Sequence, residues 1–235
     1  MEFRVMRTVN TQEIAQLYEF TKAHFVEFYD LQTELVDHLA NTIESIWETK
    51  PQFTFEQARD ASFKKFGVFG FMEVVEQRQK VMQKRYLKFL LKELQVWFSL
   101  PKLLVTSVLF IAFYLAFSSV IAKHFSIVFY ALLIVFGIYK GSILRKQYRL
   151  RQKQSHKKWL LEEYIFKQTG VIVLFLITQQ YTVRYFLDAS FNSVYANMGM
   201  ALLFTFLYLI VYVAFELLPN KAEALLQQTY PEFSL

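Results

Sequence analysis

Apolar residues recur at spacings of three and four through the first part of the chain and predict amphipathic helices. The clearest apolar stripe lies within residues 28–46 and contains Phe28, Leu31, Leu35, Leu39, Ile43 and Ile46. This spacing places the side chains on one face of a helix. Asp37 then falls nearly opposite that face, and Glu34 and His38 fall together at its boundary. We therefore expect a buried face formed by the stripe and a solvated face opposite to it.

Capping and helix-breaking residues divide this region into separate helices. Asn10 with Glu13, and Thr54 with Gln57, form two capping-box patterns that mark helix starts. Pro51 breaks the chain ahead of the second box, and Gly67 is placed to end the helix that the second box opens. We expect residues 1–100 to form a small acidic helical domain that ends in a basic helix next to the membrane.

Four apolar segments follow and predict membrane-spanning helices. Residues 103–122 and 191–215 carry no charge, and a helix of about twenty residues is about 30 Å long, enough to cross the hydrocarbon core. The segment 164–187 has the shortest apolar centre. We expect spans at 103–122, 125–144, 164–187 and 192–217. They predict an all-α fold in which residues 101–218 form a four-helix transmembrane bundle and residues 219–235 a short cytosolic tail.

The distribution of charge predicts the orientation of these spans. Lys and Arg are dense before the first span and between the second and third, so the positive-inside rule places both clusters and both termini in the cytoplasm. Three spans would place the C-terminus outside. Trp97 and Trp159 flank the membrane entries, where aromatic rings prefer the headgroup level. We expect the basic clusters to contact anionic lipid headgroups rather than nucleic acid, through Lys84, Arg85, Lys88, Arg145, Lys146, Arg149 and Arg151.

The stretch ELVDHLA, residues 34–40, offers carboxylates and a histidine within about one helical turn, a pattern that can hold a metal or move a proton. A structural zinc site needs about four ligands, the chain has no cysteine, and the other histidines lie far apart in sequence. Phosphate-binding loops and the motifs of zinc proteases and serine hydrolases are absent as well. We therefore expect no enzyme, no cofactor and no metal site.

Eight residues of the N-terminal region carry a resemblance to a known kind of module. They are Glu34, Leu35, His38, Leu39, Glu56, Ala58, Phe66 and Gly67. Their arrangement over residues 25–80 resembles the helical module that precedes bacterial permease-like segments, and the accessory domains encoded beside PadR-type regulators. The chain looks most similar to uncharacterised four-span proteins of Bacteroidota. The resemblance implies a membrane-tethered accessory or regulatory module.

Two functions follow from these patterns. The first is an accessory, regulatory or scaffold subunit that binds another protein through its cytosolic helices. The sequence does not decide whether the chain also forms a homo-oligomer. The acidic face of these helices comprises Glu27, Asp30, Glu34, Asp37, Glu44 and Glu48. It either binds a basic partner, stays solvated or folds back onto the chain's own basic loop. The alternative is a small transporter, because polar groups at membrane depth mark substrate paths. Its polar site would comprise Gln179, Gln180, Arg184 and Asn197, for which hydrogen bonding between helices is the plainer explanation.

Overall fold

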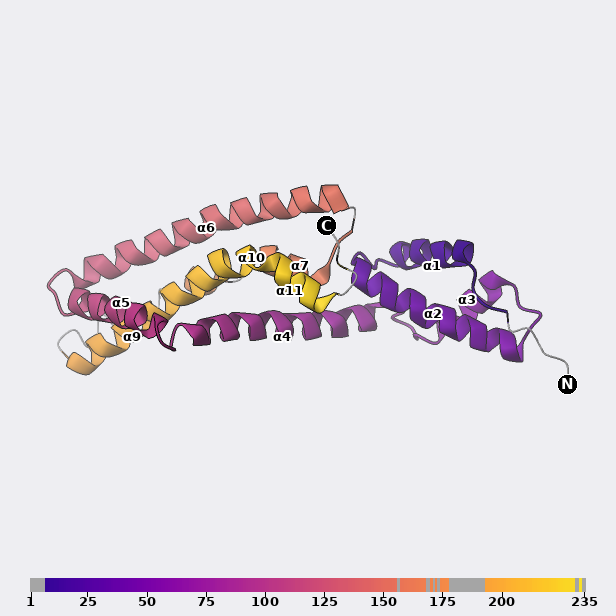
Figure 1. Ribbon diagram of the computed structural model, residues 1–235, viewed down its shortest axis with the longest axis horizontal. Coiled ribbons are helices and arrows are strands. Elements are labelled where there is room, and N and C mark those ends of the chain that lie inside the picture. Colours follow the sequence, from indigo (N-terminus) through magenta and orange to yellow (C-terminus); the bar gives the residue numbers. More distant parts are fainter. Residues whose placement is uncertain are drawn as a thin grey trace. The chain divides into compact units, whose positions relative to one another are not determined.

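The structure is a computed structural model that describes residues 7–155, 157–167, 170, 172, 174–177, 193–230 and 233. Throughout these ranges the regular secondary structure is helical and no strand occurs, which confirms the all-α prediction (Figure 1). The chain divides into two compact units. The N-terminal unit comprises Met1–Met82 together with His156–Leu160, and the second unit comprises Gln83–Ser155 and Leu161–Leu235.

The N-terminal unit is built around α2 (Tyr29–Thr49), which packs against α1 (Thr11–Ala23) and α3 (Phe55–Lys64). The predicted stripe forms its core, since Leu31, Leu35, Leu39 and Ile43 are all at most 2% exposed. The two ends of the stripe differ from the prediction. Phe28 is half-buried because α2 begins one residue later, and Trp47, one turn after Ile43, takes the buried position expected for Ile46.

Both capping boxes are confirmed. The Asn10 side chain accepts a hydrogen bond from the Glu13 N–H at 2.9 Å, and the Glu13 carboxylate accepts one from the Asn10 N–H at 2.9 Å. Thr54 and Gln57 make the same reciprocal pair at 3.0 and 3.3 Å. These bonds satisfy N–H groups that have no partner within the helix. Each helix therefore starts at the residue that its own sequence specifies.

The turn after α3 depends on two glycines in the left-handed backbone region. Gly67 has a φ of +78° and Gly70 a φ of +53°. At Gly70 a Cβ atom would also lie 2.9 Å from the ring of Phe63. The chain turns here into α4 (Met72–Val96), which begins in the N-terminal unit and ends in the second unit.

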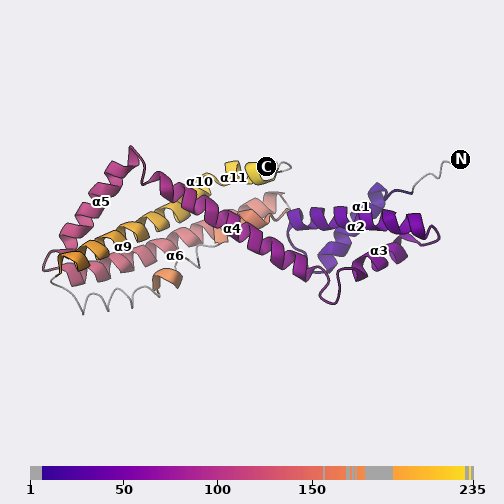
Figure 2. The ribbon, with the colours of Figure 1, turned by 90° about the horizontal axis from the view of Figure 1, so that it is seen from below.

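The second unit contains the apolar helices α5 (Lys102–Phe117), α6 (Ala122–Ser155) and α9 (Val194–Tyr212). The short α7 (Leu160–Lys167) follows α6, and α9 continues through the π-helical turn η1 (Val213–Leu217) into α10 (Leu218–Asn220) and α11 (Ala222–Thr229). α5 packs along α9, and α6 contacts both helices. Both views show α6 and α9 running in the same direction (Figures 1 and 2).

An aromatic cluster fills the space between these three helices. Phe204 of α9 is fully buried, and four rings from α5 and α6 surround it with centroids 4.8 to 6.1 Å away: Phe113, Phe117, Phe129 and Tyr130. Most of these pairs meet edge to face, an arrangement that aromatic quadrupoles favour. The phenylalanine-rich composition thus serves packing between helices.

Two helices of the described chain, His124–Ser155 and Val194–Asn220, are long and apolar enough to cross a membrane. α5 is shorter than the predicted span 103–122 and ends at Phe117. The Ser118 N–H bonds to the Tyr114 carbonyl, and the Ser119 hydroxyl donates to the Ala116 carbonyl at 2.7 Å. The Ser118 bond is the last regular bond of the helix, and after it both the N–H and the hydroxyl of Ser119 bond to the Ala116 carbonyl, where α5 ends. α6 extends beyond residue 144, and most of the predicted span 164–187 lies outside the described residues.

Candidate functional site

The side chains of the ELVDHLA stretch make structural contacts. Glu34 is half-buried and forms an ion pair with Arg78 of α4. His38 is exposed, and its ring meets the ring of Phe66 edge to face at 5.2 Å between centroids. Asp37 is exposed, as the helical wheel predicts. Within the described residues no three His, Asp or Glu side chains gather into a metal site. The stretch therefore ties α2 to α4 and to the end of α3.

Two residues of the acidic face, Glu27 and Asp30, contact the chain's own basic loop, the third of the alternatives considered for it, whereas Asp37 and Glu48 are exposed. The loop between α6 and α7, residues 157–160, belongs to the N-terminal unit. Lys158 pairs with Glu27 at 2.8 Å between the Nζ and Oε2 atoms. The Lys157 ammonium lies 4.1 Å from the centre of the Tyr29 ring, and Trp159 meets the same ring edge to face at 5.3 Å.

Backbone hydrogen bonds fix the same loop at the start of α2. Phe28 provides no side-chain cap for this helix, and the Tyr29 N–H donates instead to the Lys158 carbonyl at 2.7 Å. In return, the Asp30 carboxylate accepts a hydrogen bond from the Leu160 N–H at 3.3 Å, at the first residue of α7. Each of the two helices thus has a cap supplied by a residue about 130 positions away. Trp159 is only 4% exposed here, whereas the sequence places it at the lipid headgroups.

A different part of the N-terminal unit exposes large apolar side chains. Val68 is 98% exposed, Phe69 76% and Met72 68%, all at the turn between α3 and α4. Phe25, in the loop between α1 and α2, is 88% exposed. We call these four residues the apolar turn surface. Sequence reasoning misses it, because the pattern GVFGF shows a turn but does not show which side chains face outward.

Aromatic packing holds the two loops of the apolar turn surface on one support. The His24 ring lies 4.4 Å from the Phe63 ring and 5.9 Å from the Phe71 ring, measured between centroids. Phe63 and Phe71 meet at 4.9 Å, and the His24 Nδ1 is 2.8 Å from the Phe20 carbonyl oxygen. Because Phe25 follows His24 and the exposed turn precedes Phe71, one aromatic cluster anchors both loops.

Charged side chains in the second unit connect helices that are distant in sequence. Arg151 at the end of α6 pairs with the buried Glu162 of α7 at 2.8 Å, and also with Glu223 of α11 at 3.4 Å. Burial raises the pKa of Glu162, while the neighbouring Arg151 guanidinium lowers it and offsets part of that effect. Lys140 of α6 pairs with Glu216 of η1 at 2.5 Å. These contacts are internal to the fold and provide no open reactive group.

Most of the side chains that are predicted to contact lipid headgroups are exposed. Lys84, Arg85 and Lys88 are exposed on α4, and Arg145, Lys146 and Arg149 are exposed on α6. Arg151 differs, because it is half-buried and faces the two carboxylates named above. The exposed positions keep their long side chains available to a charged ligand.

The proposed intramembrane polar site is represented by one described residue. Gln179, Gln180 and Arg184 lie outside the described residues. Asn197 is half-buried in the first turn of α9, where its N–H bonds to the Ser193 carbonyl at 3.1 Å. Among the described residues, therefore, no group of polar side chains forms at this place.

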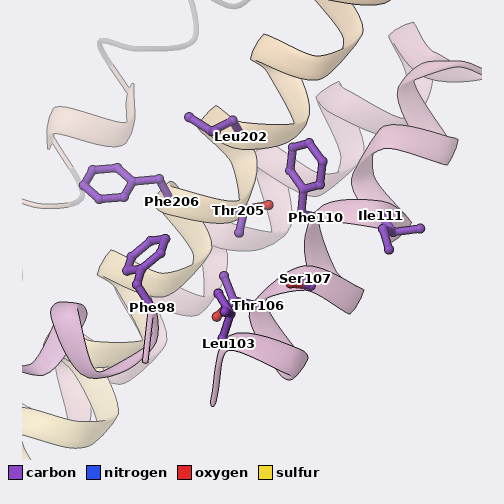
Figure 3. Close-up of a pocket in the computed structure, with 9 residues that line it drawn as sticks. All are labelled: Phe98, Leu103, Thr106, Ser107, Phe110, Ile111, Leu202, Thr205 and Phe206. Carbon is purple, nitrogen blue, oxygen red and sulfur yellow. The ribbon is translucent and has the colours of Figure 1, made fainter. Parts of the chain in front are cut away.

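The cavity between α5 and α9 is apolar. Its volume is about 380 Å³, and Figure 3 shows the side chains that line it: Phe98, Leu103, Thr106, Ser107, Phe110, Ile111, Leu202, Thr205 and Phe206. The hydroxyl groups of Thr106 and Thr205 donate to the backbone carbonyls of Trp97 and Ala201, at 2.7 and 2.8 Å. Their hydrogen-bonding capacity is thus directed to the backbone, so the cavity suits hydrocarbon better than a polar substrate.

Comparison with known proteins yields no match for this chain, whether with a family model, a curated protein or a solved structure. What the chain does is therefore inferred from the contacts, charges and exposed surfaces of its own residues.

Proposed function

We propose that this chain is a four-span protein of the bacterial inner membrane that acts as an accessory or regulatory subunit, without catalytic machinery of its own. The observation that carries the membrane part is the outward aliphatic surface of the second unit. Leu104 and Val108 of α5, Leu132 and Val135 of α6, and Leu202 of α9 are each more than 60% exposed. So much exposed hydrocarbon on neighbouring helices is costly in water and stable in lipid.

The direction of the helices supports an even number of crossings. α6 and α9 run the same way, so the chain has to return between the end of the first and the start of the second (Figures 1 and 2). A four-span arrangement supplies that return within residues 164–187 and places both basic clusters on one side. With 34 residues, α6 is about 51 Å long, longer than the hydrocarbon core, so its basic C-terminal part extends beyond the apolar layer.

Single-cysteine labelling tests this topology directly, because the native chain has no cysteine. We expect a membrane-impermeant maleimide to label a cysteine at His124 in cells with a permeabilised outer membrane and an intact inner membrane. Cysteines at Lys84, Lys153 and Glu223 should react only after the inner membrane is opened. Labelling of the Glu223 position before opening would show an odd number of spans and contradict the proposal.

The apolar turn surface supports the functional part of the proposal. Four large apolar side chains stand in solvent, and the aromatic cluster beneath them fixes the loops that carry them. Rigid exposed apolar groups are typical of a surface that another protein covers. The acidic face is less available for this role, since Glu27, Asp30 and Glu34 already contact other parts of the N-terminal unit. We therefore place the partner contact at the α3–α4 turn.

Co-purification after mild detergent extraction tests the partner contact. We expect one defined protein to accompany the full-length chain, and to be lost from the double variant Val68→Ser/Phe69→Ser. Val120→Ser is a matched control, because Val120 is also fully exposed but lies in the second unit. Retention of the partner by the double variant, or material that is consistently free of a partner, would contradict this function.

A further inference from the structure

A cavity between the C-terminal part of α6 and the end of α7 is lined by three cationic side chains and one tyrosine. It has a volume of about 300 Å³ and is lined by Arg145, Tyr148, Arg149 and Lys167. We infer that this cavity is a binding site for a phosphate ester, with the two arginines as the principal ligands. The site belongs to the second unit and is independent of the partner surface on the N-terminal unit.

The two arginines have the charge and freedom that an anionic ligand needs. Arg145 and Arg149 are one helical turn apart on α6, so both side chains project from the same face. Both are exposed, and no carboxylate in the described part of the chain forms an ion pair with either. A guanidinium group matches phosphate oxygens with two parallel hydrogen bonds, which makes paired arginines selective for phosphate.

The rest of the cavity is held in place by α7 and its neighbours. Lys167 pairs with Glu163 at 3.2 Å, and its ammonium group lies 5.0 Å from the centre of the Tyr148 ring. The Tyr148 hydroxyl donates to the same Glu163 carboxylate at 3.1 Å. Glu163 thus balances one of the three cations and positions Lys167, and the cavity keeps an excess positive charge that suits a phosphate mono- or diester.

The guanidinium group of Arg145 lies close to Gly170. A Cβ atom at Gly170 would lie 3.1 Å from Nη2 of Arg145, so the absence of a side chain lets the guanidinium approach the backbone there. Arg145 is also the first residue after the predicted second span. If the four-span proposal holds, on which this step rests, the cavity lies near the lipid phosphates. The phosphate ester is then either a lipid headgroup or a soluble phosphate compound.

Binding measurements on the full-length chain distinguish these sources. One arm places the chain in nanodiscs of phosphatidylcholine with and without phosphatidylglycerol and measures its preference for the lipid with the net negative headgroup, and the other uses glycerol 3-phosphate added to the chain in a neutral detergent. We expect Arg145→Gln/Arg149→Gln to weaken binding about tenfold or more in whichever arm binds. Binding confined to the first arm identifies a lipid headgroup, and binding in the second arm at similar affinity identifies a soluble phosphate ester. Absence of binding in both arms would overturn the site.

The matched control is Lys146→Gln/Lys153→Gln, which removes the same charge from exposed positions of α6 outside the cavity. It should change affinity by less than about twofold. An equal loss of affinity in the two double variants would show that binding depends only on the total positive charge, and would contradict a specific site in the cavity. Arg145→Lys/Arg149→Lys keeps both charges and serves as a second test if the glutamine variant does not fold. It should also bind more weakly, because an ammonium group lacks the paired donors of a guanidinium. Cysteine labelling reports the topology separately, so failure of either proposal is recognisable.

Discussion

Leu39→Ala is expected to lower the stability of the N-terminal unit by about 2–5 kcal/mol, whereas the adjacent His38→Ala is expected to cost about 1 kcal/mol or less. Leu39 is fully buried in the face of α2 that packs against α1 and α3. Its truncation removes buried hydrocarbon and leaves a cavity that a three-helix core closes only in part. His38 is exposed and contributes chiefly its ring contact with Phe66.

Native-state hydrogen exchange of α2 amides in the full-length chain, purified in detergent, measures this difference. We expect the amides of the Leu39 variant to exchange much faster, and those of the His38 variant to stay close to the wild type. Leu35→Ala should resemble the Leu39 variant, because Leu35 is 2% exposed on the same face. A His38 effect as large as the Leu39 effect would contradict a structural role and return the histidine to the candidates for function.

The local features of the N-terminal unit are predictable from sequence because their causes are local. A capping box involves residues three positions apart, and the stripe of α2 follows from the helical repeat alone. Asn10, Thr54 and Leu39 accordingly occupy the positions expected of them. The same reasoning fails at the ends of the stripe, where Phe28 precedes the first residue of α2 and Trp47 is buried in place of Ile46.

Local sequence patterns do not predict the contacts between segments that are distant in the chain. Lys158 contacts Glu27 across 131 positions, and Arg151 reaches Glu223 across 72. Hydropathy and charge place Lys158 and Arg151 in one basic loop, but they do not show that each faces a specific carboxylate. The general preference of tryptophan for the membrane interface likewise places Trp159 at the headgroups, whereas its ring is buried against the ring of Tyr29. A general preference is overridden here by one specific contact.

The same limit applies to the two proposed binding surfaces. The apolar turn surface depends on which side chains the left-handed glycines turn outward, and that depends on the packing of Phe63 and Phe71 beneath them. The phosphate cavity needs Lys167 from α7 beside two arginines of α6. Sequence identifies the arginines as anion contacts through their density, but the cavity exists only because α7 folds back toward α6.

Trp159→Ala is expected to release the loop of residues 157–160 from the N-terminal unit, with a loss of about 3–5 kcal/mol in the free energy of loop opening. The indole group is 4% exposed and packs edge to face on Tyr29, so its removal takes away buried apolar contact that holds the loop. The Tyr29 and Leu160 N–H groups, which bond to Lys158 and Asp30, then exchange with water more often. Hydrogen exchange at these two amides is the measurement.

Two control variants separate packing from electrostatics in this contact. Lys158→Gln removes an ion pair whose side chains are 44% and 67% exposed, and should cost only about 0.2–1 kcal/mol. Trp97→Ala truncates a tryptophan of the second unit, packed on Tyr212, and should leave the Tyr29 and Leu160 amides unchanged. If Lys158→Gln released the loop as fully as Trp159→Ala, the contact would be held by charge and would weaken with salt. Because the indole is buried and two capping hydrogen bonds hold the loop, we expect Trp159→Ala to release the loop far more than Lys158→Gln. We also expect the loop to stay docked at high ionic strength.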